Sequence, residues 1–220
     1  MMHRLSLPAE PIIVARQIWH TLKAEVEARY CRFVSDQALE ANMLEAAKLL
    51  TSADDRRFGI LLTGYTGTGK TAFANALRVV INSYNLIVDH EAIWKQRYTV
   101  SRYTAKTLWK RGMKEPDSLS EIANSPAIMI DDLGEDAKEA ILFGNVLTPM
   151  IDLFEHRYER RLFTIATTNL PPSELLAKYD ERVASRLNEM MLVLKFTGQD
   201  YRIGAYAIKD STEESAEKER

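Results

Sequence analysis

The chain of 220 residues contains a single cysteine, Cys31. One cysteine cannot form an internal disulfide, and without companion ligands it cannot build a structural zinc site. No apolar run resembles a signal peptide or a membrane span, because Arg16 interrupts the short apolar stretch 11–15. Neither sign of charge dominates, since 29 lysines and arginines face 31 acidic residues. These absences favour a cytoplasmic globular protein whose contacts with nucleic acid, if any, are confined to a local patch.

Hydrophobic residues make up 46% of the chain, which is enough for the core of one α/β domain. Apolar residues at helical spacing predict helices across residues 8–50. Five short apolar runs then alternate with helical patterns, at residues 58–63, 86–89, 127–131, 163–167 and 191–196. Such alternation predicts a mostly parallel five-stranded sheet flanked by helices.

This organisation predicts three parts of the chain. Residues 1–54 form a short N-terminal helical extension, which is a candidate region for binding a partner. Residues 55–208 form the α/β core. Residues 209–220 are charged and almost free of apolar side chains, so we expect a disordered tail.

The first predicted strand runs directly into Gly64-Tyr65-Thr66-Gly67-Thr68-Gly69-Lys70-Thr71, which matches the phosphate-binding pattern G-x-x-x-x-G-K-[ST]. A helical pattern follows, so strand, loop and helix come in the order that a phosphate site requires. The glycines let successive backbone N–H groups turn toward phosphates. Lys70 is predicted to contact the β- and γ-phosphates and Thr71 to bind Mg²⁺. The sequence therefore predicts a site for ATP and Mg²⁺ formed by these eight residues.

Two carboxylates, Asp131 and Asp132, end the apolar run that begins at residue 127, as in a Walker B motif. ATP hydrolysis needs carboxylates that bind Mg²⁺ and orient the attacking water. We assign Asp131 to the Mg²⁺ shell and Asp132 to polarisation of the water. Glu135 or Asp136 could assist from the following loop. Because aspartate is one methylene shorter than glutamate, Asp132 could be less effective with the water, and a protein that binds ATP without hydrolysing it remains an alternative.

Three further polar side chains are candidates for the γ-phosphate end of the site. Asn169 follows the fourth predicted strand, where it could sense the γ-phosphate or the water, although it could equally be a turn residue. Arg182 and Arg186 lie one helical turn apart. An arginine supplied to a neighbouring subunit would stabilise transition-state charge and make hydrolysis depend on an oligomer. The alternative is an i,i+4 pair on a solvated surface.

A segment rich in cations and aromatic rings lies between the second and third predicted strands. Its candidate DNA-binding residues are Trp94, Arg97, Tyr98, Arg102, Lys106 and Lys110. The spacing of Arg102, Lys106 and Lys110 predicts that they share one face of a helix. Proteins that bind single strands combine such a basic track with rings on which bases stack. An amphipathic helix whose rings pack on the sheet is the alternative.

Together, the segments GYTGTGKT, IMIDDLGED, FTIATTN, DERVASRL and GQDYR resemble the DnaC/DnaI-type helicase loaders and the related IstB-type transposition ATPases, both AAA+ proteins. The resemblance implies the strand order 5-1-4-3-2. It also implies a sensor-1 role for Asn169, an arginine finger at Arg186 with Arg182 as its companion, and a nucleotide contact for Arg202. With so few residues after Phe196, we expect no full C-terminal lid domain.

The resemblance further implies binding of ATP and Mg²⁺, assembly into a homo-oligomer or with a partner ATPase, and contact with single-stranded DNA. The leading hypothesis is a slow, partner- or DNA-regulated ATPase that loads a replicative helicase. A helper ATPase that acts with a transposase is the first alternative, because the core motifs do not separate the two. A P-loop kinase of a small molecule and a non-hydrolysing binding module are the others.

Overall fold

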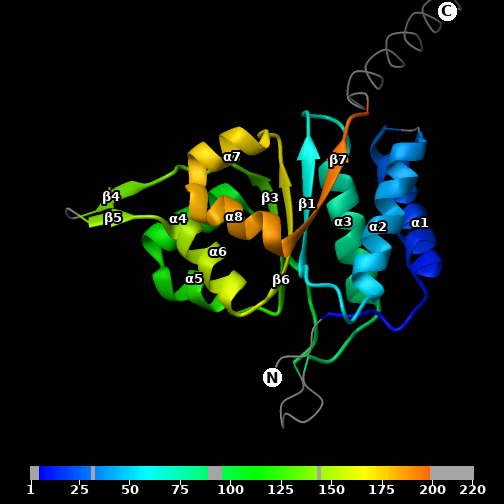
Figure 1. Ribbon diagram of the computed structural model, residues 1–220, viewed down its shortest axis with the longest axis horizontal. Helices are drawn as coiled ribbons and strands as arrows, with labels where there is room; N and C mark the ends of the chain where they lie inside the picture. The colour runs from blue at the N-terminus through cyan, green and yellow to red at the C-terminus, as the bar shows by residue number, and fades with distance from the viewer. Residues whose placement is uncertain (1–4, 31–32, 89–95, 143–144, 199–220) are drawn as a thin grey trace, which may run out of the picture.

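The computed structural model describes residues 5–30, 33–88, 96–142 and 145–198 (Figure 1). The helices are α1 (Pro11–Tyr30), α2 (Gln37–Thr51), α3 (Lys70–Ser83), α4 (Ala105–Lys114), α5 (Pro116–Ala123), α6 (Pro149–Glu159), α7 (Pro172–Tyr179) and α8 (Glu181–Met190). The strands are β1 (Gly59–Gly64), β2 (Ser101–Thr104), β3 (Ala127–Leu133), β4 (Ala140–Leu142), β5 (Asn145–Leu147), β6 (Phe163–Thr168) and β7 (Met191–Phe196). Cys31, Trp94 and Arg202 lie outside the described residues, as does the predicted tail.

Five strands form one sheet in the order β2-β3-β6-β1-β7, and every neighbouring pair is parallel. Numbered along the chain, these strands give the expected order 5-1-4-3-2, which confirms the predicted fold class. Because all strands run the same way, their carboxyl ends meet at one edge of the sheet. The loops after β1, β3 and β6 therefore lie next to one another, although they are far apart in the sequence.

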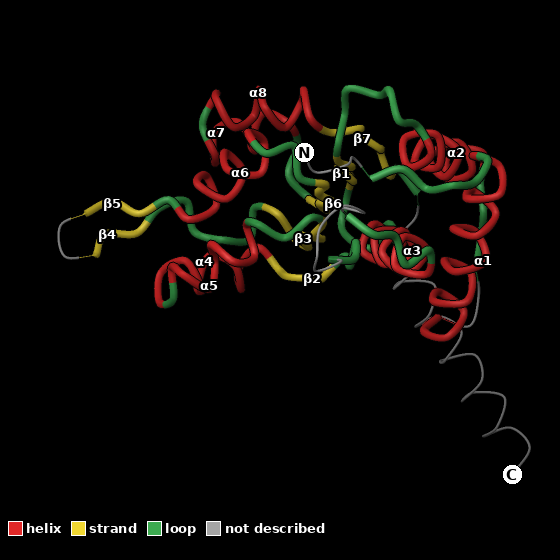
Figure 2. Tube along the Cα trace, turned by 90° about the horizontal axis from the view of Figure 1, so that it is seen from below, coloured by secondary structure: helices red, strands yellow, loops and turns green. Residues whose placement is uncertain are grey.

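Each face of the sheet is covered by its own group of helices, so the domain has three layers (Figures 1 and 2). Successive side chains of a strand point to opposite faces. Ile60 and Leu62 thus pack in one apolar cluster with α1, α2 and α3. Leu61 packs in the other cluster with α4 to α8. Both faces are buried, which explains why the strands read as nearly continuous apolar runs.

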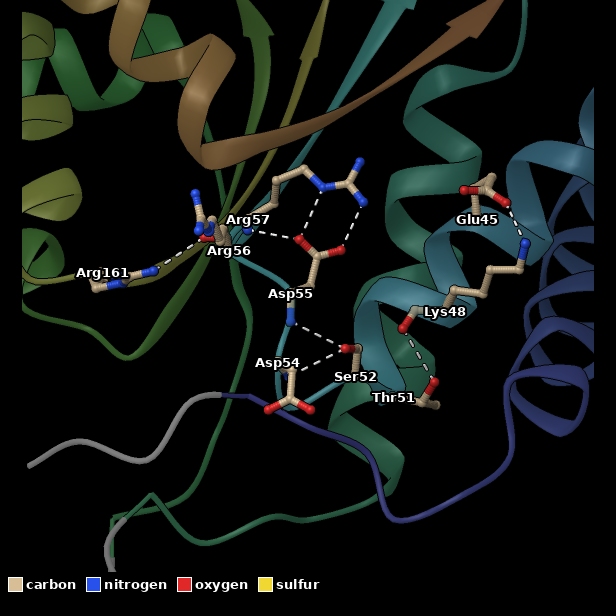
Figure 3. Close-up of polar contacts among 9 residues, drawn as sticks. All are labelled: Glu45, Lys48, Thr51, Ser52, Asp54, Asp55, Arg56, Arg57 and Arg161. Carbon is tan, nitrogen blue, oxygen red and sulfur yellow. Dashed lines mark hydrogen bonds and ion pairs between the residues drawn. The ribbon is translucent and has the colours of Figure 1, made fainter.

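The N-terminal helices belong to the first of these clusters. Leu22 of α1 and Leu50 of α2 are buried together with Phe73 and Leu77 of α3. The connection from α2 to β1 is fixed by polar contacts, since Asp55 forms an ion pair with Arg57 at 2.7 Å and receives a hydrogen bond from its backbone at 2.8 Å (Figure 3). The extension 1–54 is thus packed on the core through its described helices.

The second strand of the sheet differs from the predicted one. Residues 86–89 were expected to form it, but within the described part of that segment only Ile87 pairs, in an isolated antiparallel bridge with Arg97. The strand next to β3 is instead β2, which is short and partly exposed at the sheet edge. An edge strand of three polar residues and one tyrosine lacks the apolar run that marks a buried strand, so the apolar segment 86–89 was the wrong choice.

A two-stranded antiparallel hairpin of β4 and β5 was not predicted. It follows the loop after β3 and extends away from the body of the domain (Figures 1 and 2). Each of its strands has only three residues, too few for a periodic pattern to show in the sequence.

Candidate nucleotide-binding site

The loop between β1 and α3 has the geometry of a phosphate cradle. Gly69 precedes α3 in a left-handed conformation, with φ of 90°, which a side chain would strain. Gly64 is fixed by packing, because a Cβ atom there would lie 2.1 Å from the carbonyl oxygen of Phe196. The Lys70 ammonium is buried against the loop and donates to the carbonyls of Gly64 at 2.8 Å and Tyr65 at 2.6 Å. The N-terminus of α3 and the Lys70 charge thus meet at one place, which suits phosphate.

The Asp131 carboxylate is the centre of a polar network at the carboxyl end of the sheet. It is 2% exposed. Its Oδ1 atom accepts hydrogen bonds from the hydroxyls of Thr71 at 2.9 Å and Thr167 at 2.6 Å. Its Oδ2 atom accepts one from the guanidinium of Arg102 at 2.5 Å. The network thereby connects the N-terminus of α3 with β2, β3 and β6.

The oxygens of Thr71 and Asp131 fit a Mg²⁺ ion that also contacts a nucleotide. Among the described residues no three acidic, histidine or cysteine side chains cluster as a metal site. Mg²⁺ in nucleotide sites is bound by one or two protein oxygens together with substrate phosphates and water, so a larger cluster is not needed. The 2.9 Å contact between Thr71 and Asp131 brings such a pair together beside the phosphate loop.

The environment of Asp132 differs from that of Asp131. It is half-buried and adopts a left-handed backbone with φ of 56°, which aspartate tolerates better than most residues. Its N–H donates to Thr167 Oγ1 at 3.0 Å. Burial, and then the neighbouring charges of Asp131 and Glu135, raise the pKa of the Asp132 carboxyl above its ordinary value. A carboxylate with a raised pKa is suited to accept a proton from water.

The two other acidic candidates, Glu135 and Asp136, lie in the loop after Asp132 and have different surroundings. Glu135 lines the cavity described below, whereas Asp136 is buried and accepts a hydrogen bond from the hydroxyl of Tyr179. Burial, and then the charge of Asp136, raise the pKa of Tyr179, so its hydroxyl keeps its proton. The expectation that Asp136 could assist hydrolysis is therefore wrong in this conformation, because its carboxylate anchors the loop to α7.

A cavity of about 620 Å³ opens over this network. Its lining comprises Val26, Arg29, Tyr30, Thr66, Gly67, Gly69, Lys70, Thr71, Ala72, Arg102, Thr104, Lys106, Asp131, Asp132, Glu135 and Asn169. Most of the phosphate loop, both carboxylates and Asn169 thus line one cavity, and their roles there stay predictions. Gly64 does not line it. Tyr65 is 82% exposed and Thr68 is buried, and neither lines the cavity.

Arg182 and Arg186 lie away from this cavity. Both guanidinium groups contact Glu155 Oε1 on α6, at 3.1 Å and 2.9 Å. Arg186 also lies over the ring of Tyr158, at 5.0 Å from its centroid. The two arginines therefore point the same way, as predicted, and neither lines the cavity. Their roles in nucleotide binding and hydrolysis stay predictions.

The structure corrects the proposed DNA-binding face. Arg102 lies on β2, and α4 begins only at Ala105, so Arg102 does not share a helix face with Lys106 and Lys110. The hydroxyl of Thr104 caps α4 by accepting from the N–H of Thr107 at 3.1 Å. The spacing of four residues from Arg102 to Lys106 therefore crosses the boundary between β2 and α4. Thr104, a residue type that favours helix N-caps, could have indicated this boundary in the sequence.

Of the other described candidates for DNA binding, one is buried in the core and three are exposed. Tyr98 is 6% exposed, so its ring packs in the core and does not offer a face to a base. Arg97, Lys106 and Lys110 are exposed. Contact of these three cations with DNA stays a prediction.

Several residues of the site were missed in the sequence. Thr167 contacts the Asp131 carboxylate and the backbone N–H of Asp132 because β6 lies directly beside β3, and the predicted strand order could have suggested it. Thr104 reaches the cavity from β2. Val26, Arg29 and Tyr30 reach it from α1, and no local motif marks them, since they are distant in sequence from the phosphate loop.

No family model matches the chain, and no curated protein matches it. Solved structures do. The DnaC helicase loader is 20% identical with a TM-score of 0.57, over 83% of this chain and 99% of that one. DnaI is 18% identical with a TM-score of 0.57, over 79% and 94%. The replication initiator DnaA bound to AMPPCP and single-stranded DNA is 14% identical with a TM-score of 0.52, over 86% and 54%.

These likenesses show the fold of the chain, which is that of the solved DnaC, DnaI and DnaA structures. The DnaC/DnaI-like architecture confirms, at the level of fold, the resemblance drawn from the motifs. No described helix is both long and apolar enough to cross a membrane.

Proposed function

We propose that this protein is an ATP-binding and ATP-hydrolysing assembly factor that loads a replicative helicase. The observation that carries the proposal is the hydrogen bond of 2.9 Å between Thr71 and Asp131 at the floor of the cavity. It joins the phosphate loop to the acidic strand end, as ATP-dependent chemistry requires. The DnaC/DnaI-like fold supports the choice of a loader among the P-loop proteins.

In this proposal each residue of the site has a defined task. Backbone N–H groups of the phosphate loop and the Lys70 ammonium bind the β- and γ-phosphates, while Thr71 and Asp131 bind Mg²⁺. Mg²⁺, when bound, neutralises charge on the phosphates. Asp132 accepts a proton from the attacking water, and Asn169, at the exposed end of β6, orients that water or senses the γ-phosphate.

Hydrolysis is completed by an arginine from a second subunit. Arg186 lies outside its own subunit's cavity, and its side chain is 16% exposed because it pairs with Glu155. To reach a neighbour's phosphate, the guanidinium would leave that carboxylate. Arg182, which shares the Glu155 carboxylate, accompanies it at the same surface. A guanidinium supplied in trans makes turnover depend on assembly. ATP then favours the assembled state, and hydrolysis releases it.

Contact with single-stranded DNA is proposed for α4. Lys106 and Lys110 are exposed one turn apart on that helix, and Lys106 also lines the nucleotide cavity. Two ammonium groups at this spacing can follow a phosphate backbone. The position of Lys106 would place the DNA close to the nucleotide.

The first experiment is a binding assay with the replicative helicase of the same organism. The purified protein is mixed with the helicase in ATP or ADP, and the mass of the complex is measured by light scattering after size-exclusion chromatography. We expect a complex that forms in ATP and weakens in ADP. The variant Lys70→Ala should form no such complex, because it lacks the ammonium that contacts the phosphates.

The matched control is Lys114→Ala, which removes an exposed ammonium at the end of α4, outside the cavity lining. It should bind nucleotide and helicase as the wild type does. If the wild type binds ATP but no helicase in either nucleotide, the loader proposal is wrong, and the transposition helper becomes the better hypothesis. If the wild type binds no ATP, or Lys70→Ala keeps its ATP affinity, the assignment of the site itself is wrong.

A further inference from the structure

Both oxygens of the Asp131 carboxylate already have hydrogen-bond partners. Two hydroxyl groups, from Thr71 and Thr167, contact Oδ1. Oδ2 is contacted by the Arg102 guanidinium, at a distance of 2.5 Å. Arg102 is therefore the partner of Oδ2, whereas the two hydroxyl groups are the partners of Oδ1.

Strand register explains how Arg102 reaches this oxygen. β2 lies beside β3, with Thr104 opposite Asp131 and Arg102 opposite Met129. Residues two apart on a strand point to the same face, so Arg102 and Thr104 both face the nucleotide cavity, and both line it. Arg102 is the long side chain that extends along this edge to Asp131.

The environments of the two charges differ. The Asp131 side chain is 3% exposed, whereas the Arg102 side chain is 39% exposed. A carboxylate buried to this degree is strongly destabilised unless a positive charge or several donors compensate it. A half-exposed arginine, in contrast, can leave its partner at little cost, because water solvates the guanidinium as it moves.

We propose that Arg102 and Mg²⁺ alternate on Asp131: the guanidinium neutralises the carboxylate when no metal is bound and leaves Oδ2 when the metal binds with ATP. This inference rests on the proposed function, because it assigns a residue of the same site. The released guanidinium stays near the cavity, which Arg102 lines, but is no longer on the carboxylate. Arg102 thus acts on the nucleotide site and is not part of a DNA-binding helix face.

The test is a Mg²⁺ titration of nucleotide binding. Binding of a fluorescent, non-hydrolysable ATP analogue is measured by anisotropy at increasing free Mg²⁺, for the wild type and for Arg102→Ala. Removing the competing cation should lower the Mg²⁺ concentration for half-maximal binding by a factor on the order of ten, the size expected for a charge-assisted contact that is partly screened. Arg102→Lys should lie between the two, because it keeps the charge without the fork.

Two controls separate competition from general effects of charge. Arg160→Ala removes an exposed arginine at the end of α6, outside the cavity lining, and should leave the Mg²⁺ dependence unchanged. In an Asp131→Asn background, Arg102→Ala should no longer shift the Mg²⁺ dependence, because the carboxylate that the two cations share is absent. Thermal unfolding of each variant checks that it is folded.

The outcomes distinguish the inference from the function on which it rests. An unchanged or increased Mg²⁺ requirement in folded Arg102→Ala, with normal binding by the wild type, would overturn the alternation alone. A shift of equal size in the Asp131→Asn background would overturn it too, since Arg102 would then act through its charge at a distance. If the wild type binds no nucleotide at any Mg²⁺ concentration, the proposed function fails.

Discussion

Replacing Thr167 by valine tests whether one hydroxyl fixes both the Asp131 carboxylate and the backbone of Asp132. The Thr167 side chain is 1% exposed, and valine has nearly the same shape, so no cavity forms. The hydroxyl donates to Asp131 Oδ1 at 2.6 Å and accepts from the N–H of Asp132 at 3.0 Å. Thr167→Val therefore removes a charge-assisted bond and leaves a backbone donor without its partner.

The size of the effect follows from these two bonds. A hydrogen bond to a charged group contributes about 1.5–3 kcal/mol, and an unpaired buried donor costs about 1–3 kcal/mol. Asp131 keeps Thr71 and Arg102, and half-buried Asp132 can reach water, so the lower part of each range applies. We expect Thr167→Val to lower the free energy of unfolding by about 2–4 kcal/mol, measured by urea denaturation.

The matched control is Thr164→Val, on the same strand but at the opposite end from the site. Thr164 is also buried, and its hydroxyl accepts from Arg157 Nε at 2.9 Å and donates to the carbonyl of Leu162 at 3.2 Å. It should lose similar stability and keep Mg²⁺-dependent nucleotide binding, whereas Thr167→Val should bind the nucleotide several-fold more weakly. Equal nucleotide binding by the two variants would refute a role of Thr167 in the site.

Other residues of the site and its surroundings give three further tests. Glu135→Gln should move the acidic limb of the ATPase pH profile to lower pH. The substitution removes one negative charge that raises the pKa of Asp132, and only the deprotonated form of Asp132 can accept a proton from water. Arg186→Ala should bind ATP normally but turn over slowly, and mixing it with Lys70→Ala protein should restore activity if the arginine acts in trans. A mixture that stays inactive contradicts that role. Lys110→Glu should weaken single-strand binding and flatten its salt dependence, and an unchanged salt slope would exclude α4 as the DNA contact.

The phosphate loop was predictable because its chemistry is contiguous in the sequence. Eight adjacent residues from Gly64 to Thr71 carry both the bends and the side chains that a phosphate site needs, and a strand and a helix flank them. The same holds for Asp131 and Asp132, which follow an apolar run within one strand. Local motifs of this kind fix conformation and chemistry together, so they can be recognised without tertiary contacts.

Arg102 shows where sequence patterns misled. Its spacing from Lys106 and Lys110 fits a helix, but hydrogen bonds to β3 hold residues 101–104 in a strand. The energy of that pairing comes from a partner almost thirty positions away, which no local period contains. An arginine assigned to DNA by its spacing is therefore found on the Asp131 carboxylate.

The sequence by itself determined the fold class, the phosphate loop and the acidic strand end, because each depends on the order of neighbouring residues. Only the tertiary structure decided which distant residues complete the site. Thr167 contacts the Asp131 carboxylate and the Asp132 N–H, Arg102 contacts Asp131, and residues of α1 line one side of the cavity. The tertiary structure also decided that Arg182 and Arg186 share Glu155 away from the cavity. The physical reason is that a parallel sheet brings the carboxyl ends of its strands together, and the partners met there are set by strand order and register.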